Sequence, residues 1–328
     1  MFMPVSDLQK TRPTSAESTR QLASEVRTDL SKPQKELHSK YLYDELGSAL
    51  FEAITRLPEY GVSRADERVL QMHASDIADL IPEPVAVVEL GSGMGRKTRY
   101  VLSALERPAC VLRYFPIDVS HEALARCQRE LADIADVHPL EDSYLDGMAR
   151  AAVQRGPHES LLVLFLGSTI GNFERSCAID FLRDLREWLV PGDALLIGAD
   201  LLKDRDRMLL AYDDPTGVTA AFNLNLLGRI NRELDADFDL SKFKHEARWN
   251  ESERRIEMHL RSQVDQSVFI PGADFRAGFD AGETIWTESS HKFYSHEMWE
   301  MAGQTGFCVK AQWVDSEWAF VESLWMVR

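Results

Sequence analysis

The sequence predicts an α/β fold, a doubly wound parallel sheet joined to a second, α+β lobe, on three observations. Between residues 85 and 198, short apolar runs alternate with stretches of helical period. This alternation is typical of βαβ units, whose parallel sheet is covered by helices on both faces. A Gly-rich turn, Gly91-Ser92-Gly93-Met94-Gly95, follows the first apolar run. Residues 251–290 contain runs of period two instead, as antiparallel strands do.

The expected elements follow in chain order, beginning with helices. Residues 1–40 are polar, and we expect a mobile start followed by a helix. Residues 46–57 and 65–80 have helical period, and Pro58-Glu59-Tyr60-Gly61 between them is a turn signal. In the core, strands are expected at 85–90, 110–117, 160–166 and 194–198, with helices at 97–105, 120–131 and 174–189.

Beyond residue 202 the alternation stops. Residues 203–250 look helical, with loops. The period-two runs at 255–262 and 284–290 predict strands. A helix and two strands close the chain, at 296–304, 307–313 and 319–326.

These patterns predict four segments. Residues 1–60 are a helical segment that contributes to a substrate lobe, and 61–202 are the cofactor-binding core. Residues 203–290 are an inserted substrate-binding lobe, and 291–328 return to the core. A lobe at the carboxyl ends of the strands would make a cleft at the usual ligand position of such sheets.

Composition and charge argue against some classes of function. The chain has 328 residues, of which 45% are hydrophobic and 27% charged, as in ordinary globular proteins. Its formal net charge is −16 and it has no dense basic block, so a nucleic acid is not an expected partner. No apolar run approaches the roughly 18 residues of a membrane-spanning helix. We expect a small-molecule substrate, and a monomer because heptads are absent.

The cysteines, histidines and first residues give further expectations. Four cysteines lie far apart without a CxxC pair, which fits free thiols in a reducing cytoplasm. Nine histidines show no spacing such as HExxH, so we expect no metal site. Residues 1–15 lack the charged start and apolar run of a secretory signal.

The Gly-rich turn does not have the spacing of a dinucleotide site. Gly91, Gly93 and Gly95 do not fit GxGxxG, and the acid Glu89 precedes them. This suits a ligand without a pyrophosphate and makes an NAD-dependent oxidoreductase the weaker alternative. An ordinary tight turn between strand and helix is the other interpretation.

Two acidic positions follow at later turns. Asp118 ends the next strand, where a carboxylate can accept hydrogen bonds from both hydroxyls of a ribose. The alternative is a helix N-cap, a role that Ser120 could take instead. Asp142 and Ser143 follow the third crossover, where a solvated loop is an equal interpretation.

Two polar sites suggest recognition of an amino acid. Asn172 lies after the buried run at 160–166, and its amide can donate to a carboxylate and accept from an amine. Its alternative role is the N-cap of the next helix. Glu288 and Ser290 are two apart, so on a strand they share a face. An acceptor beside a hydroxyl suits a heterocycle with two nitrogens, and the alternative is a solvated strand face.

With these segments assembled, the chain resembles the histidine-specific Nα-methyltransferases of ergothioneine biosynthesis, from about Tyr41 to its end. The motifs that carry the resemblance are Tyr43-Asp44-Glu45-Leu46-Gly47-Ser48, Leu57-Pro58-Glu59-Tyr60, Glu89-Leu90-Gly91-Ser92-Gly93, Gly167-Ser168-Thr169-Ile170-Gly171-Asn172, the run 212–225, Ile230-Asn231-Arg232-Glu233-Leu234, Asp237-Phe238-Asp239-Leu240, Ile256-Glu257-Met258-His259 and Thr287-Glu288-Ser289-Ser290. Without reference to the family, the alternative interpretation of the run 212–225 is a polar loop that leads into a capped helix.

The resemblance implies a class I methyltransferase-like fold and a reaction. S-adenosylmethionine would be the cofactor and S-adenosylhomocysteine its product. L-histidine would be methylated three times on its α-nitrogen to hercynine, the first step of ergothioneine biosynthesis. Relatives methylate other amino acids, so tryptophan or a modified histidine stays an alternative substrate. A non-catalytic binding protein on the same fold is the alternative from a different class.

The resemblance also implies roles for individual residues. Asn172 and Tyr212 would hold the substrate carboxylate and amine, assisted by the backbone at Gly167. Tyr43 and Tyr60 would cover the reacting amine. The residues expected to contact the imidazole are Glu288, Ser290 and Met258. The catalytic set is Tyr43, Asn172 and Tyr212, and the residues expected to bind the cofactor are Tyr60, Gly91, Lys97, Asp118, Asp142 and Ser143.

Overall fold

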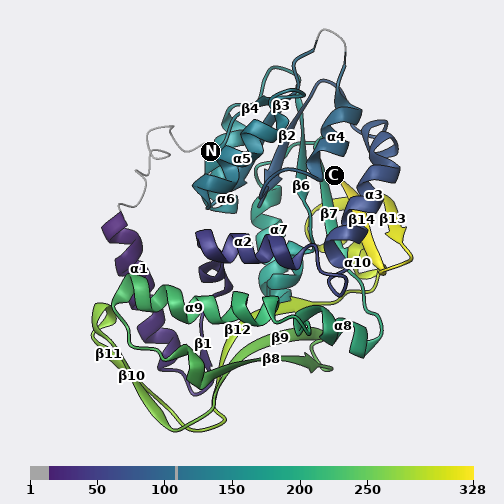
Figure 1. The fold of residues 1–328 in the computed structure, drawn as a ribbon. Coiled ribbons are helices and arrows are strands. Elements are labelled where there is room, and N and C mark those ends of the chain that lie inside the picture. The colour runs from purple at the N-terminus through teal and green to yellow at the C-terminus, as the bar shows by residue number, and fades with distance from the viewer. Residues whose placement is uncertain (1–14, 108–109) are drawn as a thin grey trace. The chain divides into compact units, whose positions relative to one another are not determined.

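The computed structural model describes residues 15–107 and 110–328, so the start expected to be mobile lies largely outside the described residues. The chain forms two compact units (Figure 1). Unit 1 comprises Met1–Ile54, Leu209–Trp249 and Glu257–Glu288, and unit 2 comprises Thr55–Met208, Asn250–Ile256 and Ser289–Arg328. The expected segment ends at residues 60, 202 and 290 lie a few residues from these boundaries, and the four-segment division stays a prediction.

Unit 2 contains an eight-stranded sheet in the order β13-β14-β7-β6-β2-β3-β4, with β5 paired to β3. Its strands are β2 (Val85–Leu90), β3 (Arg113–Asp118), β4 (Asp136–Val137), β5 (Leu140–Glu141), β6 (Ser160–Phe165), β7 (Ala194–Asp200), β13 (Phe307–Asp315) and β14 (Phe320–Val327). Strands β3, β2, β6 and β7 pair in parallel, and β14 and β13 extend the β7 edge in antiparallel pairing. The predicted doubly wound class is therefore confirmed.

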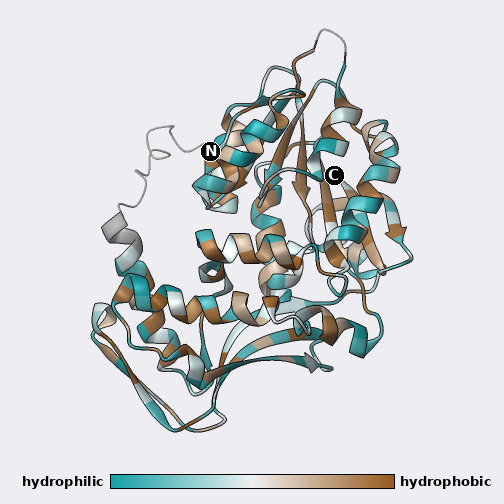
Figure 2. Ribbon diagram, viewed as in Figure 1, coloured by the Kyte–Doolittle hydropathy of each residue, from teal (hydrophilic) through white to brown (hydrophobic). Residues whose placement is uncertain are grey.

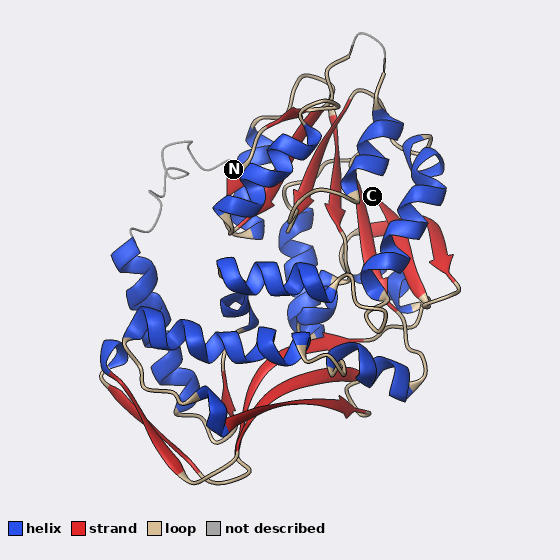
Figure 3. Cartoon of the chain, in the orientation of Figure 1, coloured by secondary structure: helices blue, strands red, loops and turns tan. Residues whose placement is uncertain are grey.

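The central strands are buried on both faces, which explains why they appear as continuous apolar runs in the sequence. Ala86, Val88 and Leu90 of β2 pack on one side of the sheet, and Val85 and Val87 pack on the other. Helices supply both layers, and Figures 2 and 3 show the apolar strands between them. One layer holds α6 (Tyr144–Val153), α7 (Arg175–Arg186) and α10 (Glu297–Gln304), and the other holds α3 (Val62–Ala78), α4 (Thr98–Leu105) and α5 (His121–Leu131).

The strand order places the loops after β2 and β6 at the same edge of the sheet. The chain leaves β2 for β3 on one side and later returns as β6 on the other side of β2. The order thus reverses at β2, and ligands of open α/β sheets bind at the carboxyl ends of the strands at such a point. The loops after β2 and β6 contain Gly91 and Gly167, two of the predicted site residues.

Unit 1 contains a sheet in the order β1-β12-β9-β8 and a separate antiparallel hairpin, β10–β11. The strands are β1 (Lys35–Glu36), β8 (Phe243–Asn250), β9 (Arg255–Ser262), β10 (Gln266–Ile270), β11 (Phe275–Phe279) and β12 (Thr284–His291), of which β8, β9 and β12 end or begin in unit 2. The helices are α1 (Ser15–Leu30), α2 (Glu45–Ile54), α8 (Arg205–Tyr212) and α9 (Val218–Leu234). Helix α8 is shared with unit 2. The 3-10 turns are η2 (Ser39–Leu42), η4 (Leu240–Lys242) and η5 (Pro271–Ala273).

Two expectations about this region need correction. Residues 243–250 form strand β8 and not a helix, because pairing with β9 overrides the helix-favouring Lys, Glu, Ala and Arg residues in its sequence. The hairpin β10–β11 is not in the prediction, since its strands are only five residues long. Within the described ranges, no helix combines the length and apolar character that a membrane crossing requires.

Candidate functional site

The Gly-rich loop after β2 has a left-handed backbone. The φ angle is +74° at Gly91, +51° at Gly93 and +70° at Gly95, a region that favours glycine. A Cβ on Gly91 would lie 3.2 Å from the hydroxyl oxygen of Tyr144. The loop therefore presents bare backbone at the carboxyl end of β2, where a ligand can approach closely.

Asp118, at the end of β3, faces this loop. Its Oδ2 accepts the N–H of Gly93 at 3.0 Å, and its Oδ1 accepts the N–H of Ser120 at 2.9 Å. Burial raises the pKa of Asp118, and these backbone N–H groups oppose that shift. Ser120, not Asp118, caps α5, since its hydroxyl accepts from the N–H of Ala123 at 3.2 Å. The N-cap interpretation of Asp118 is therefore wrong, and each carboxylate oxygen keeps a lone pair for a ligand hydroxyl.

Asp142 and Ser143 lie beside Asp118, because the N–H of Asp142 donates to the Asp118 carbonyl at 3.2 Å. Both side chains have structural partners. The carboxylate of Asp142 accepts from Arg150 at 3.0 Å, and the hydroxyl of Ser143 caps α6 by accepting the N–H of Asp146 at 3.3 Å. Any ligand contact at these two residues has to coexist with these bonds.

Lys97 is joined to the loop after β6 by a residue that sequence reasoning missed. Its ammonium forms an ion pair with Oδ2 of Asp66, which also accepts the N–H of Gly167 at 2.9 Å. Burial disfavours the ammonium, but the ion pair outweighs this effect and the pKa of Lys97 is raised. Asp66 is fully buried in α3, so a charged residue on the apolar face of a predicted helix is the signal that could have revealed it.

Glu322 lies next to this ion pair and is also absent from the prediction. It is fully buried on β14, opposite Gly198, where a Cβ would lie 2.6 Å from its Oε1. Burial, together with the nearby carboxylate of Asp66, raises the pKa of Glu322 well above its usual range. Burial and the neighbouring carboxylate thus both disfavour the ionised form of Glu322.

Glu89, the acid before the glycines, is buried against two hydroxyls. Its carboxylate accepts from Thr98 at 2.7 Å and from Tyr114. Burial raises its pKa to about 7, although both hydroxyls oppose this shift. The carboxyl group thus points into the core beneath the glycine loop, and its interaction partners are those of a structural group.

This raised pKa predicts a pH dependence of stability. Unfolded Glu89 titrates near 4.3, so between about pH 4 and 7 the folded chain binds more protons than the unfolded chain. The contribution of Glu89 to stability is therefore fully present below pH 4 and declines as pH rises to 7. Glu89→Gln removes this decline. We expect denaturant unfolding of the variant to match wild type near pH 4 and to require up to about 4 kcal/mol more free energy at pH 8; a difference that stays constant with pH contradicts the assignment.

Asn172 is positioned by the turn after β6. Gly167 and Ser168 have φ angles of +72° and +61°, and the hydroxyl of Ser168 accepts the N–H of Asp200 at 2.9 Å. Asn172 ends the 3-10 turn η3 (Thr169–Asn172), whereas the N-cap of α7 is Glu174. The N-cap interpretation of Asn172 is therefore wrong. Across residues 15–107 and 110–328 its half-buried amide has no hydrogen-bond partner, so it is available to a ligand.

The end of β12 packs against this turn. A Cβ on Gly171 would lie 3.0 Å from the carbonyl oxygen of His291, which follows Ser290. Ser290 is 5% exposed and accepts a hydrogen bond from the ammonium of Lys292 at 2.8 Å. Glu288 is half-buried on the same strand. The interpretation as a solvated strand face is therefore wrong for Ser290.

In unit 1, Tyr43 belongs to an aromatic group. Its ring lies 5.5 Å from the ring of Phe51 and 5.5 Å from that of Phe222, both in edge-on contact. Next to it, Asp44 accepts from the amide of Asn225 at 2.7 Å and pairs with Arg232, which ties the segment between η2 and α2 to α9. Tyr43 is therefore held by packing on rigid elements.

Tyr212 and Met258 are both buried in unit 1. The Tyr212 carbonyl accepts from Nε2 of His245 at 2.8 Å, and Nδ1 of that ring accepts from Asn223 at 2.9 Å. Burial lowers the pKa of His245, which agrees with a neutral ring. Asp214, two residues on, accepts the N–H of Thr219 in the first turn of α9 at 2.8 Å, so part of the run 212–225 is a loop that leads into a helix, as in the alternative interpretation.

The predicted site residues are divided between the two units. Those in unit 2 are Tyr60, Gly91, Lys97, Asp118, Asp142, Ser143, Gly167, Asn172 and Ser290. Those in unit 1 are Tyr43, Tyr212, Met258 and Glu288. All the residues predicted to bind the cofactor thus fall on unit 2.

Among the described residues, no group of three or more His, Cys, Asp or Glu side chains is arranged to hold a metal ion.

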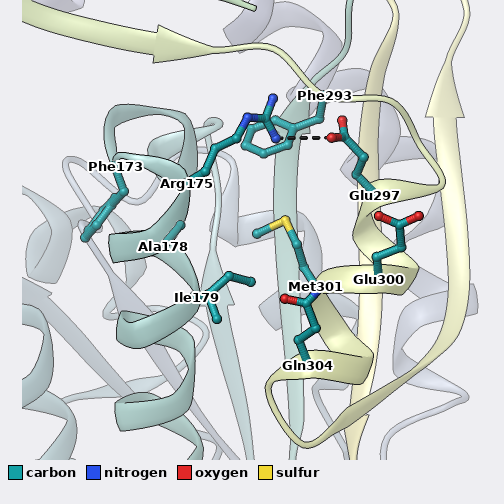
Figure 4. A pocket seen from close by; sticks show the side chains of 9 residues that line it. All are labelled: Phe173, Arg175, Ala178, Ile179, Phe293, Glu297, Glu300, Met301 and Gln304. Atoms are coloured by element: carbon teal, nitrogen blue, oxygen red, sulfur yellow. Dashed lines mark hydrogen bonds and ion pairs between the residues drawn. The ribbon is translucent and has the colours of Figure 1, made fainter. Parts of the chain in front are cut away.

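A pocket of about 150 Å³ lies elsewhere in unit 2, between α7 and α10 (Figure 4). Arg175 lies over the Phe293 ring, 5.1 Å from its centre, and bonds to Glu297 at 3.2 Å. The lining residues are Phe173, Arg175, Ala178, Ile179, Phe293, Glu297, Glu300, Met301 and Gln304. None of them is a predicted site residue, although Phe173 directly follows Asn172.

Comparison with known proteins gives consistent matches. A family model described as "Histidine-specific methyltransferase, SAM-dependent" matches residues 22–327. A histidine N-alpha-methyltransferase of Mycolicibacterium smegmatis is 40% identical over 92% of this chain and 94% of that protein. Ergothioneine biosynthesis protein 1 of Schizosaccharomyces pombe is 32% identical over 82% of this chain and 35% of that protein. An L-tryptophan methyltransferase of Psilocybe serbica is 27% identical over 92% of this chain and 91% of that protein.

Proposed function

Because the chain belongs to the family of S-adenosylmethionine-dependent, histidine-specific methyltransferases, we propose that it converts L-histidine to hercynine by three successive transfers of a methyl group to the α-nitrogen. This is the first step of ergothioneine biosynthesis, and the similarity to ergothioneine biosynthesis protein 1 agrees with it. The single observation that carries the proposal is a family match over residues 22–327, which includes every predicted site residue.

We assign the cofactor to the carboxyl ends of β2 and β3 in unit 2. The residues there fit S-adenosylmethionine, since Gly91 and Gly93 let a ligand approach the backbone and Asp118 has acceptor capacity for a ribose. Lys97, whose ammonium is paired with Asp66, is proposed to contact the cofactor as well. When bound, the cofactor supplies a methyl group on a sulfonium. Tyr60, Asp142 and Ser143 complete the proposed set.

The contacts with the substrate are proposed residue by residue. Asn172, with the backbone at Gly167, is proposed to hold the α-amino and carboxylate groups, and Tyr212 acts with it. The available amide of Asn172 supports this role, since it offers a donor and an acceptor at once. Only a neutral amine has a lone pair to attack, and its pKa lies above neutrality. The amine therefore has to lose one proton to solvent before each of the three transfers, and each transfer releases the sulfonium as S-adenosylhomocysteine.

The aromatic residues suit the product. Three methyl groups make a quaternary ammonium ion, which aromatic rings attract through cation–π contact. Tyr43, packed against Phe51 and Phe222, is assigned to this role together with Tyr60 of unit 2. Glu288, Ser290 and Met258 are assigned to the imidazole.

The alternative substrate is another amino acid, as the similarity to an L-tryptophan methyltransferase illustrates. Indole has one N–H group and no acceptor nitrogen, so it cannot use both a carboxylate and a donating hydroxyl. The pair of Glu288 and Ser290 therefore favours imidazole.

We also propose a cytoplasmic monomer. The free thiols of Cys110, Cys127, Cys177 and Cys308 support a reducing compartment.

The function is tested by mass spectrometry of reactions with S-adenosylmethionine and each of the twenty amino acids, plus mono- and dimethylhistidine. We expect products with one, two and three added methyl groups from histidine and its methylated forms, and none from the other amino acids. Methylation of tryptophan in place of histidine overturns the imidazole assignment and retains the transferase. Cofactor binding without any product overturns the enzyme assignment.

A further inference from the structure

A buried histidine of unit 1 bonds to the backbone of a predicted substrate residue. His245, on β8, is 5% exposed, and its Nε2 lies 2.8 Å from the carbonyl oxygen of Tyr212. Tyr212 is the last residue of α8, where a carbonyl group has no partner within its own helix. A carbonyl oxygen can only accept, so this contact places a hydrogen on Nε2. His245 therefore holds the backbone from which the Tyr212 side chain extends.

The opposite nitrogen of this ring is held by Asn223, which is fully buried on α9. The side-chain nitrogen of Asn223 lies 2.9 Å from Nδ1 of His245 and 3.1 Å from the carbonyl oxygen of His259, on β9. Because that carbonyl only accepts, the NH2 end of the amide has to face it, and the reversed amide would set two oxygens against each other. Asn223 thus donates one hydrogen to each partner, and Nδ1 of His245 accepts.

The two ends of the His245 ring specify the same state independently. Nε2 carries the hydrogen because it faces a carbonyl, and Nδ1 lacks one because it faces an NH2 group. With the tautomer reversed, Nδ1 would direct its hydrogen at those of Asn223, and Nε2 would set a lone pair against the Tyr212 carbonyl. Burial also favours the neutral ring, since it lowers the pKa of His245. Asn223 thereby makes His245 a donor toward Tyr212.

We propose that Asn223 and His245 form a relay that positions Tyr212 for the amino-acid substrate. The inference rests on the proposed function, in which Tyr212 acts with Asn172 on the α-amino and carboxylate groups. His245 is a positioning residue in this scheme, because it acts through the backbone of Tyr212 and not on the substrate. The relay joins the end of α8 to β8 and α9, the two elements that carry His245 and Asn223.

The relay affects turnover because its members are buried. Loss of the His245 ring nitrogens leaves the Tyr212 carbonyl and the Asn223 amide without these partners inside the protein, which costs free energy unless the end of α8 moves. A shift of about 1 Å in a group that holds a substrate can lower turnover on the order of 100-fold. Cofactor binding should be unaffected, because the residues predicted to bind the cofactor lie on unit 2.

The chain offers a graded pair of variants and a matched control. His245→Gln keeps an amide N–H that can reach the place of Nε2 and donate to Tyr212, whereas His245→Leu has a similar volume and no donor. His259→Leu is the control. His259 is likewise buried, on the adjacent strand β9, and Asn223 uses only its backbone carbonyl, which the substitution keeps. Thermal melting shows whether each variant is folded.

The readouts are kcat/KM for L-histidine, followed by mass spectrometry, and the Kd of S-adenosylhomocysteine, from calorimetry. In His245→Leu we expect kcat/KM to fall on the order of 10- to 100-fold while the Kd stays within about threefold of wild type. In His245→Gln and His259→Leu we expect both quantities to stay within about threefold of wild type, because Tyr212 keeps its donor.

Three outcomes overturn the proposal. The first is a wild-type kcat/KM in His245→Leu. The second is an equal loss in His245→Gln or in His259→Leu, since the N–H group toward Tyr212 is then not what matters. The third is a matching loss of S-adenosylhomocysteine affinity in His245→Leu, because the disturbance then reaches beyond the substrate residues.

A second measurement tests the relay in the wild-type protein and needs no variant to fold. Nitrogen NMR of the labelled histidine rings distinguishes the two tautomers and the imidazolium, and through-bond correlation to the backbone assigns the signals of His245. At pH 7 we expect a hydrogen on Nε2 and none on Nδ1. The reverse tautomer, or a ring protonated at both nitrogens, overturns the proposal. Failure of wild type to methylate any amino acid overturns the proposed function instead, and the ring signals still report the state of His245.

Discussion

Replacing Asp118 by alanine is expected to weaken the binding of S-adenosylhomocysteine on the order of 100-fold, because two hydrogen bonds to a charged acceptor are lost together. The carboxylate already accepts from Gly93 and Ser120, which fixes both oxygens at the end of β3. Their remaining lone pairs are directed by this geometry, so the proposed ribose diol would meet a preorganised acceptor. Calorimetric titration of S-adenosylhomocysteine into the apoprotein measures the loss directly.

Two further variants distinguish a direct loss of cofactor binding from a disturbance of the Gly-rich loop after β2. Asp118→Asn keeps a carbonyl oxygen that can accept from Gly93 but has less acceptor capacity, so we expect a loss between those of wild type and Asp118→Ala. Asp136→Ala is the control, since the side chain of this acid on the neighbouring β4 is exposed and bonds to His138 at 2.9 Å, within its own segment. Unchanged affinity in Asp118→Ala would place the ribose-binding acid elsewhere.

The core of the fold could be predicted because its strands are buried on both faces. The observed bounds of β2, Val85–Leu90, agree with the apolar run of the sequence, and β6 ends one residue before the run does. Strand β8 shows the limit of this reasoning. Its side chains are mostly half-buried, so no apolar alternation marks it, and its conformation depends on pairing with β9.

The candidate site was predictable only where residues lie in loops next to strands. Asp118 and Asn172 follow predicted strands, and the structure gives each a place at the carboxyl edge of the sheet. Asp66, Glu322 and Lys292 could not be identified in this way. Each is a buried ionisable group, and only the tertiary arrangement shows that Asp66 bonds to Gly167 or that Lys292 bonds to Ser290.

Replacing Asn172 by alanine is expected to lower the turnover of histidine on the order of 100-fold, since the amine and carboxylate would no longer be held in the attacking geometry. The fold should be unaffected. Asn172 does not cap α7, and within the described part of the chain its amide holds no other element in place. We therefore expect a melting temperature close to that of wild type and nearly normal S-adenosylhomocysteine affinity. Turnover is measured by mass spectrometry at saturating cofactor.

Asn231→Ala provides the opposite case in the same chain. The Asn231 side chain donates to the Phe238 carbonyl at 2.8 Å and accepts the Phe238 N–H at 2.9 Å, closing the turn after α9. Its loss should lower the melting temperature by about 2–4 °C per kcal/mol of lost stability and leave turnover near wild type. If Asn172→Ala behaves in this way, with a lower melting temperature and retained turnover, its amide has a structural role and the substrate amine is held by other groups.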